Sequence, residues 1–179
     1  IVANNGTYGL TKGQNSATTD PGSKNKKGVD NALEAIDIAG LALQLGATFV
    51  ARSFSGDKNQ LEPLLKAAIA HKGFALIDCL SPCVTFNNNP GSTKSYDYIR
   101  EHNETLNRTD FVPMKEEIVT HYEPGSSHEV CLHDGSVLHL HKLGDEYDVG
   151  NRIDALHYLQ RKQSEGKVLT GLLYINTDT

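Results

Sequence analysis

Hydrophobic residues in the first half of the chain fall into short runs that are typical of buried strands. Residues 1–3 are apolar, and Asn4-Asn5-Gly6 then ends the run with residues that favour a turn. Residues 47–53 are rich in β-branched and aromatic side chains, which predicts a second strand. Residues 74–80 form a continuous apolar run, as expected for a strand that is buried on both faces. The pattern therefore predicts three strands of one sheet.

Two helices are expected between these strands. The first begins at Asn31, which has Glu34 at the third helical position of a capping box, and continues to Leu45. Apolar residues occupy most faces of this segment, so we expect it to be deeply buried. The second helix, predicted over 57–71, opens with similar capping residues and joins two predicted strands. A strand, a helix and a strand in this order predict a βαβ unit with parallel strands.

The pattern changes after about residue 90. The elements expected there are a helix over 95–103, a strand over 117–120, strands over 128–133 and 136–142 around an Asp134-Gly135 turn, a helix capped by Asp148, and a strand over 167–176. We therefore expect an α/β fold with a mostly parallel sheet flanked by helices. Its core comprises residues 1–90, and residues 91–179 form a C-terminal arm or appendage that contains the hairpin, the last helix and the last strand.

The composition indicates the general kind of protein but does not indicate a function. A chain of 179 residues with 38% hydrophobic content and a mean hydropathy of −0.41 is typical of one globular domain. No apolar run is long enough for a membrane span, and no signal peptide is visible. Three cysteines, an odd number, favour a reducing cytoplasm over a disulfide framework. The net charge of −5 gives no reason to expect a nucleic-acid partner.

The turn after the first predicted strand carries candidate ligands. Asn5 offers an amide oxygen and Thr7 a backbone carbonyl, and both are hard ligands that suit Mg²⁺ or Ca²⁺. Lys12 is a cation that could meet an anionic substrate. In an open α/β sheet, ligands gather at the carboxyl ends of the strands, where this turn is expected. Taken alone, however, these residues favour an ordinary strand-end turn, because Asn-Gly is a common turn sequence.

The longer motif around this turn is more specific. The run Asn4-Asn5-Gly6-Thr7-Tyr8-Gly9-Leu10-Thr11-Lys12-Gly13-Gln14 resembles the thiamine-pyrophosphate loop of 2-oxoacid:ferredoxin oxidoreductase β subunits. The similarity continues through 46–52, 81–87 and 91–98 and so covers most of the chain. It implies a thiamine-diphosphate-binding fold, present here in part.

The resemblance also implies roles for the residues of the loop. Asn5 and the carbonyl of Thr7 would hold Mg²⁺ against the diphosphate of thiamine pyrophosphate. Tyr8, Gly9 and Leu10 would line the thiazolium side of the pocket.

Two further residues receive roles from the same resemblance. Lys12 would face the substrate, and its charge suits the second carboxylate of 2-oxoglutarate. Cys83 corresponds to one cysteine ligand of a [4Fe–4S] cluster, although a lone cysteine taken by itself favours a structural role. The implied activity is oxidative decarboxylation of a 2-oxoacid with coenzyme A, giving acyl-CoA, CO₂ and reduced ferredoxin.

Parts of such an enzyme are not found in this sequence. The acidic Mg²⁺ ligand and the other three cluster cysteines belong upstream of Ile1, so we expect an N-terminally truncated chain that is inactive alone. The family also completes the cofactor pocket with a partner α subunit. Two alternatives remain open: another thiamine-pyrophosphate enzyme, which would not need Cys83, and a non-catalytic α/β interaction domain.

Other chemistries have less support. With a two-residue turn at Asp134-Gly135, His128 pairs with His141, which places His128, His139 and His141 on one face. Three imidazoles could bind zinc, but apolar residues share that face, and ordinary sheet histidines are favoured over a metal site. The sequence has no GxSxG elbow, no GxGxxG and no GxxxxGK[ST], so a hydrolase, a dinucleotide fold and a P-loop lack their motifs.

Overall fold

The computed structural model describes residues 1–112, 128–131, 136–142 and 147–178. Its main sheet has five strands in the order β1-β5-β4-β10-β6. Three of the four neighbouring pairs are parallel, and only β4 and β10 are antiparallel. The predicted mostly parallel sheet is therefore confirmed. The five strands are β1 (Val2–Asn4), β5 (Ala75–Leu80), β4 (Phe49–Phe54), β10 (Val168–Ile175) and β6 (Asn103–Thr105).

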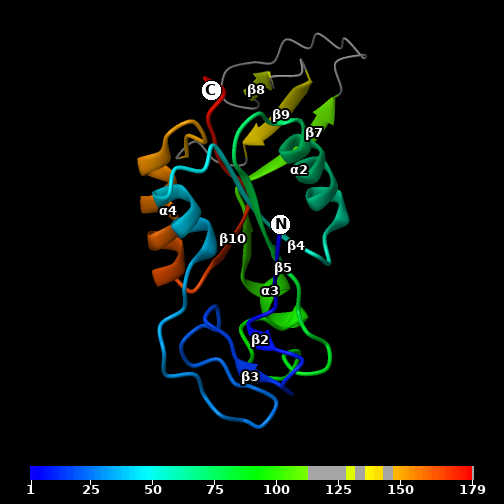
Figure 1. Ribbon diagram of the computed structural model, residues 1–179, viewed down its shortest axis with the longest axis vertical. Coiled ribbons are helices and arrows are strands. Elements are labelled where there is room, and N and C mark those ends of the chain that lie inside the picture. The colour runs from blue at the N-terminus through cyan, green and yellow to red at the C-terminus, as the bar shows by residue number, and fades with distance from the viewer. Residues whose placement is uncertain (113–127, 132–135, 143–146, 179) are drawn as a thin grey trace.

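Helices cover both faces of this sheet (Figure 1). On one face, α1 (Ile38–Gln44) and α4 (Arg152–Ser164) pack on β4 and β10. On the other face, α2 (Lys58–Ala70) packs on β4, β5 and β10. Because side chains alternate along a strand, β4 supplies Val50 to the first core and Phe49 to the second. The sheet is thus buried on both faces, as a parallel sheet requires.

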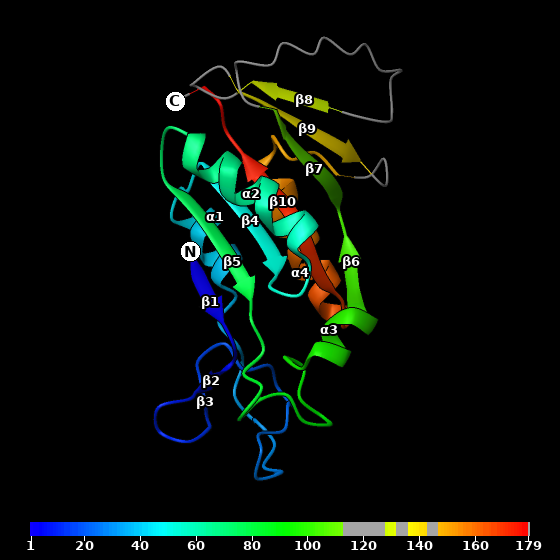
Figure 2. The same cartoon turned by 90° about the vertical axis from the view of Figure 1, so that its right-hand side faces the viewer.

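Smaller elements lie at the two ends of the main sheet (Figures 1 and 2). At one end, β2 (Thr7–Tyr8) and β3 (Gln14–Asn15) form a short hairpin, and α3 (Tyr96–His102) lies nearby. At the other end, three antiparallel strands form a second sheet in the order β7-β9-β8. These strands are β7 (Asn107–Val112), β9 (Val137–Lys142) and β8 (His128–Cys131).

The predicted strands over 1–3, 47–53, 74–80 and 167–176 are confirmed, and so are α2 and α3. The first helix is shorter than predicted, because Asp37 rather than Asn31 is its N-cap. Asn31 is fixed in the preceding loop, where its Nδ2 donates to the carbonyls of Thr19 and Leu33, both at 2.8 Å. The expected deep burial is also wrong for one face of α1, since Leu41 is 46% exposed.

The N-cap of α4 is likewise displaced from its predicted position. Asn151 accepts hydrogen bonds from the backbone of Ile153 and Asp154, whereas Asp148 accepts one from Gly150 N at 2.8 Å. The predicted cap therefore stabilises the turn before the helix instead of the helix itself.

The hairpin of β8 and β9 is confirmed, but its predicted register is wrong by one residue. His128 pairs with Leu140, and Cys131 pairs with Val137. The observed pairing therefore differs from the pairing of His128 with His141, from which the shared face of His128, His139 and His141 was predicted. The strand predicted over 117–120 lies outside the described residues.

The last strand, β10, belongs to the main sheet. β10 lies between β4 and β6, and Leu172 and Leu173 are fully buried. The C-terminal strand is therefore part of the core sheet. Its apolar sequence fits this position, because a strand in the middle of such a sheet is covered on both faces. The division of the chain at residue 90 otherwise stays a prediction.

None of the helices within the described residues has the length and apolarity that crossing a membrane requires.

Candidate functional site

The candidate site lies where the parallel strands β1, β5 and β4 end together. Residues 4–7, called here the strand-end turn, connect β1 to the β2–β3 hairpin. Asn5 Oδ1 accepts a hydrogen bond from Thr7 N at 2.9 Å, and Gly6 adopts a φ of 65°. A side-chain oxygen that bonds the backbone two residues ahead stabilises such a turn, and glycine tolerates the left-handed backbone. The turn thus places the Asn5 amide and the Thr7 backbone side by side.

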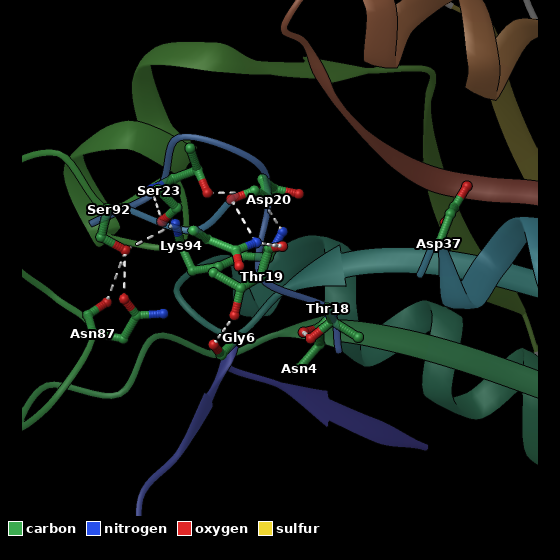
Figure 3. Close-up of polar contacts among 12 residues, drawn as sticks. Asn4, Gly6, Thr18, Thr19, Asp20, Ser23, Asp37, Asn87, Ser92 and Lys94 are labelled. Atoms are coloured by element: carbon green, nitrogen blue, oxygen red, sulfur yellow. Dashed lines mark hydrogen bonds and ion pairs between the residues drawn. The ribbon is translucent and has the colours of Figure 1, made fainter. Parts of the chain in front are cut away.

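A buried polar network fixes the start of this turn to the sheet. Asn4 Nδ2 donates to Asp78 Oδ1 at 3.0 Å. Asn4 Oδ1 accepts from Thr18 Oγ1 at 2.7 Å (Figure 3). Arg52 Nε donates to Asp78 Oδ2 at 2.8 Å, and its other end pairs with Asp37, the N-cap of α1. The side chains of β1, β5 and β4 are therefore joined by one chain of charge-assisted hydrogen bonds.

Each buried charge of this network has a partner of opposite charge. Asp78 is only 1% exposed, so an isolated carboxylate there would be costly. Burial alone would lower the pKa of Arg52, but the adjacent Asp78 and Asp37 carboxylates raise it overall, which keeps the guanidinium charged. Burial also raises the pKa of the neighbouring Cys79 thiol, and the Asp78 carboxylate adds to this effect. The network therefore serves to hold strands together.

Gly6 is enclosed by segments that are distant in the sequence. Its carbonyl accepts a hydrogen bond from Ser16 N at 3.2 Å and another from the Thr19 hydroxyl. A Cβ atom at residue 6 would lie 2.9 Å from Lys94 Cγ and 3.1 Å from Asn87 Nδ2. Close approach of the backbone therefore requires glycine at this position.

A second ion pair closes the wall beside Gly6. Lys94 Nζ lies 2.7 Å from Asp20 Oδ2, and Thr93 Oγ1 donates to the same carboxylate oxygen at 2.5 Å. The contact joins the loop that follows the hairpin to the segment that precedes α3 (Figure 3). Burial raises the pKa of the nearby Tyr98 hydroxyl, and the charges of Asp20 and Glu101 raise it further.

A cavity of about 250 Å³ lies between these two ion-pair clusters. Its polar lining includes Asn4, Asp20, Arg52, Asp78 and Lys94, and α4 contributes Leu159 and Gln163. Two ion pairs in this lining join its charged groups across the cavity wall, Asp20 with Lys94 and Arg52 with Asp78. Asn5 and Lys12 are not part of the lining, so this cavity is not the cofactor pocket that the resemblance implies.

The other end of the motif is exposed. Residues 9–12, called here the hairpin tip, connect β2 to β3. Leu10 is 98% exposed, Lys12 is exposed with a φ of 72°, and Tyr8 at the end of β2 is 56% exposed. The tip is closed by local hydrogen bonds, from Lys12 N to Gly9 O at 3.1 Å and from Gly13 N to Tyr8 O at 2.9 Å. No contact in the described residues holds the Lys12 ammonium near Asn5.

The structure thus brings together Asn5 and Thr7 but leaves Tyr8, Gly9, Leu10 and Lys12 on the hairpin. Cys83 lies nearby on a turn after β5, where it is a free, half-buried thiol. Asn87 links the two turns, because its backbone N donates to Cys83 O and its Nδ2 donates to Asn5 O, both at 2.8 Å. The assigned roles of all these residues stay predictions.

Sequence reasoning missed the groups that support the turn. Asp78 offered a signal, because a carboxylate inside a continuous apolar run needs a buried partner. Asn4, Arg52, Asn87 and Lys94 gave no local signal, because each finds its partner across the fold.

The donor set fits Mg²⁺ in part. Asn5 Oδ1 retains a lone pair beyond its bond to Thr7 N, and carbonyl and amide oxygens are the hard ligands that Mg²⁺ prefers. Within the described residues, no three His, Cys, Asp or Glu side chains cluster as a metal site. Cys83 alone supplies one of the four thiolates that a [4Fe–4S] cluster uses.

The strand-end turn lies within a segment that is similar to a known protein family. Residues 1–79 match the family model for the "Thiamine pyrophosphate enzyme, C-terminal TPP binding domain". The predicted thiamine-diphosphate-binding fold is therefore confirmed for this segment.

Two proteins with more specific names are similar in sequence to part of the chain. The chain is 49% identical over 88 residues to a 2-oxoacid:ferredoxin oxidoreductase subunit beta from Sulfolobus sp, and the match covers 49% of the chain and 29% of that protein. It is 38% identical over 102 residues to the 2-oxoglutarate oxidoreductase subunit KorB from Mycobacterium tuberculosis, which covers 56% of the chain and 26% of that protein. The predicted resemblance to 2-oxoacid:ferredoxin oxidoreductase β subunits is confirmed over this part of the chain.

A solved structure extends the likeness to almost the whole chain. It is the 2-oxoglutarate:ferredoxin oxidoreductase from Magnetococcus marinus with 2-oxoglutarate, coenzyme A and succinyl-CoA bound. The two share 25% sequence identity with a TM-score of 0.67, over 99% of this chain and 46% of that one. The chain thus spans less than half the length of the solved relative.

Proposed function

We propose that this chain is part of the β subunit of a 2-oxoacid:ferredoxin oxidoreductase. The intact enzyme would oxidatively decarboxylate a 2-oxoacid with coenzyme A to acyl-CoA, CO₂ and reduced ferredoxin. The observation that carries the proposal is the strand-end turn, in which the Asn5 amide and the Thr7 backbone lie together at the carboxyl ends of parallel strands. This turn lies inside the segment that matches thiamine-pyrophosphate enzymes.

Each residue of the motif would have a distinct task. Asn5 Oδ1 and the Thr7 carbonyl would bind Mg²⁺, which in turn would bind the diphosphate. When bound, thiamine pyrophosphate supplies a carbanion for addition to the keto carbon and an acceptor for the electrons that decarboxylation frees. Asn4 and Gly6 position this turn through their contacts with Asp78 and Thr19.

The hairpin tip would act on the substrate side. Tyr8, Gly9 and Leu10 would line the thiazolium ring together with the α subunit. Lys12 would bind the second carboxylate of 2-oxoglutarate, which pyruvate lacks. The exposure of Leu10 supports this arrangement, because an apolar side chain at a hairpin tip gains most from a partner that covers it.

The electron path would begin at Cys83. As one thiolate ligand of a [4Fe–4S] cluster, it would help to pass single electrons to ferredoxin. The remaining ligands would come from a part of the protein outside this sequence. The half-buried position of Cys83 beside the strand-end turn supports this role.

The test is a turnover assay of the full-length β subunit purified with its α subunit. Reduction of a viologen dye should require both 2-oxoglutarate and coenzyme A. The Lys12→Ala variant should lose about tenfold or more in kcat/KM for 2-oxoglutarate and little for pyruvate, because only the first substrate has the second carboxylate. Lys58→Ala, which removes another exposed lysine, is the matched control.

Two outcomes would contradict the proposal. A complex that binds no thiamine pyrophosphate would point to a non-catalytic interaction domain. A complex that decarboxylates without iron or ferredoxin would point to another thiamine-pyrophosphate enzyme. An unchanged substrate preference in Lys12→Ala would reject only the role of Lys12.

A further inference from the structure

Asn87 is a buried asparagine that contacts both turns of the candidate site. It is 3% exposed, so its amide gains little from water and depends on protein partners. Its Nδ2 donates to Asn5 O at 2.8 Å, which is the carbonyl of the candidate metal ligand. Its backbone N donates to Cys83 O at 2.8 Å and thereby closes the turn of the candidate cluster ligand.

A serine fixes the orientation of this amide. Ser92 Oγ donates to Asn87 Oδ1 at 2.8 Å, and the same Oγ accepts from Lys94 N at 3.2 Å (Figure 3). With Oδ1 occupied by a hydroxyl donor, Nδ2 must point toward Asn5. Ser92 is 1% exposed, so neither partner exchanges readily with water.

The packing leaves this contact little freedom. Asn87 Nδ2 lies 3.1 Å from the point where a Cβ atom of residue 6 would stand, so the amide occupies space that only glycine leaves open. On the other side, the ring of Phe86 packs against Gly13, the residue before β3, since a Cβ atom there would lie 3.2 Å from the ring. Phe86 and Asn87 thus connect the Cys83 turn to Gly13 and to the strand-end turn.

We propose that Asn87 is a positioning residue that couples the metal-binding turn to the Cys83 turn. A displacement of one turn is transmitted to the other, because a single side chain and its own backbone bond both. The proposal rests on the proposed function, since it takes Asn5 as a Mg²⁺ ligand and Cys83 as a cluster ligand. The proposal adds a physical connection between the thiamine pyrophosphate site and the electron acceptor. Binding of either group alone does not depend on this connection.

The experiment uses the full-length β subunit with its α subunit. Calorimetry measures the Kd of thiamine pyrophosphate at fixed Mg²⁺, and redox titration followed by electron paramagnetic resonance measures the midpoint potential of the cluster with and without the cofactor. In the wild type, binding of Mg²⁺ and thiamine pyrophosphate should shift this midpoint. In Asn87→Ala, the Kd should rise about tenfold, as the loss of a buried hydrogen bond predicts, and the shift should disappear while the cluster remains.

Two further variants separate positioning from general damage. Ser92→Ala leaves Nδ2 in place but removes the group that orients it, so it should change both quantities in the same direction and by less. It also serves as the test if Asn87→Ala does not fold. Asn59→Ala removes an exposed asparagine from α2 and should match the wild type in both measurements.

The outcomes are distinguishable. A wild-type complex that binds neither cofactor nor iron overturns the proposed function and this inference with it. A wild type that binds both, together with folded variants that keep the wild-type Kd and midpoint shift, overturns only the role of Asn87. The same holds if the wild-type midpoint does not respond to the cofactor.

Discussion

The strand-end turn and the hairpin tip are neighbours in the sequence but are held in opposite ways. Residues 4–7 are contacted by groups from three distant segments, including Asp78, Asn87 and Thr19. Residues 9–12 are held by hydrogen bonds within the hairpin itself, and Leu10 is almost fully exposed. One end of the motif is therefore fixed by this chain, whereas the other presents an apolar side chain and a lysine to the outside.

This difference indicates how the site would be divided between subunits. Metal ligands need a fixed geometry, and a turn that is preorganised by buried partners supplies it without cost at the moment of binding. Residues that contact a substrate or a partner subunit can instead be ordered by that contact. The proposed roles of Asn5 and Lys12 follow this division.

The largest effect is expected from removing the charge beneath the strand-end turn. In Asp78→Asn, Arg52 loses the more buried of its two carboxylate partners and keeps only Asp37, which should lower the free energy of unfolding by about 3–5 kcal/mol. Urea unfolding followed by circular dichroism measures this loss. Asp30→Asn is the matched control, because Asp30 pairs with Lys24 at 3.7 Å on an exposed surface and should cost about 0.5 kcal/mol or less. Equal losses in the two variants would show that the buried network does not support the turn.

A smaller effect is expected from crowding the turn. Gly6→Ala combines a left-handed backbone with a Cβ atom 2.9 Å from Lys94 Cγ, so its total cost should be about 2–4 kcal/mol. Gly22→Ala has a similar φ of 76° but meets no atom within 4 Å, and should cost only about 1 kcal/mol. The difference between the two variants, measured by thermal unfolding, isolates the packing around Gly6. No difference would mean that the turn is free to move away.

The smallest effect on stability is expected at the hairpin tip. Leu10→Ser should leave the free energy of unfolding unchanged within about 0.5 kcal/mol, because the side chain buries almost nothing in this chain. If the tip contacts the α subunit, the same variant should weaken assembly of the two subunits, which analytical ultracentrifugation measures. A destabilised chain with unchanged assembly would reverse the contrast between tip and turn.

Local sequence signals predicted much of the fold, and the errors have a common cause. The apolar runs at 47–53 and 74–80 predicted β4 and β5 because burial on both faces leaves a continuous hydrophobic pattern. The start of α1 differs from its prediction because Asn31 bonds Thr19 across the loop, while Asp37 serves both as N-cap and as partner of Arg52. A capping motif cannot reveal which of two polar residues has a partner elsewhere.

The candidate site was predicted only as far as the motif extends. Asn5 and Thr7 could be named because they stand in one run of sequence. The contacts of Asn87 with residue 5 and of Asp78 with residue 4 join positions 82 and 74 residues apart, and no periodic pattern reports such pairs. The register of β8 and β9 differs from the predicted one by one residue, because a turn sequence alone does not determine which residues of two strands pair.

The central claim is that the strand-end turn holds Mg²⁺ for thiamine pyrophosphate, and calorimetry on the full-length β subunit with its α subunit tests it directly. The wild type should bind thiamine pyrophosphate only when Mg²⁺ is present, and Asn5→Ala should need at least about tenfold more Mg²⁺ for half-maximal binding, because a hard oxygen ligand is lost. Binding that is independent of Mg²⁺, or that Asn5→Ala leaves unchanged, would contradict the account.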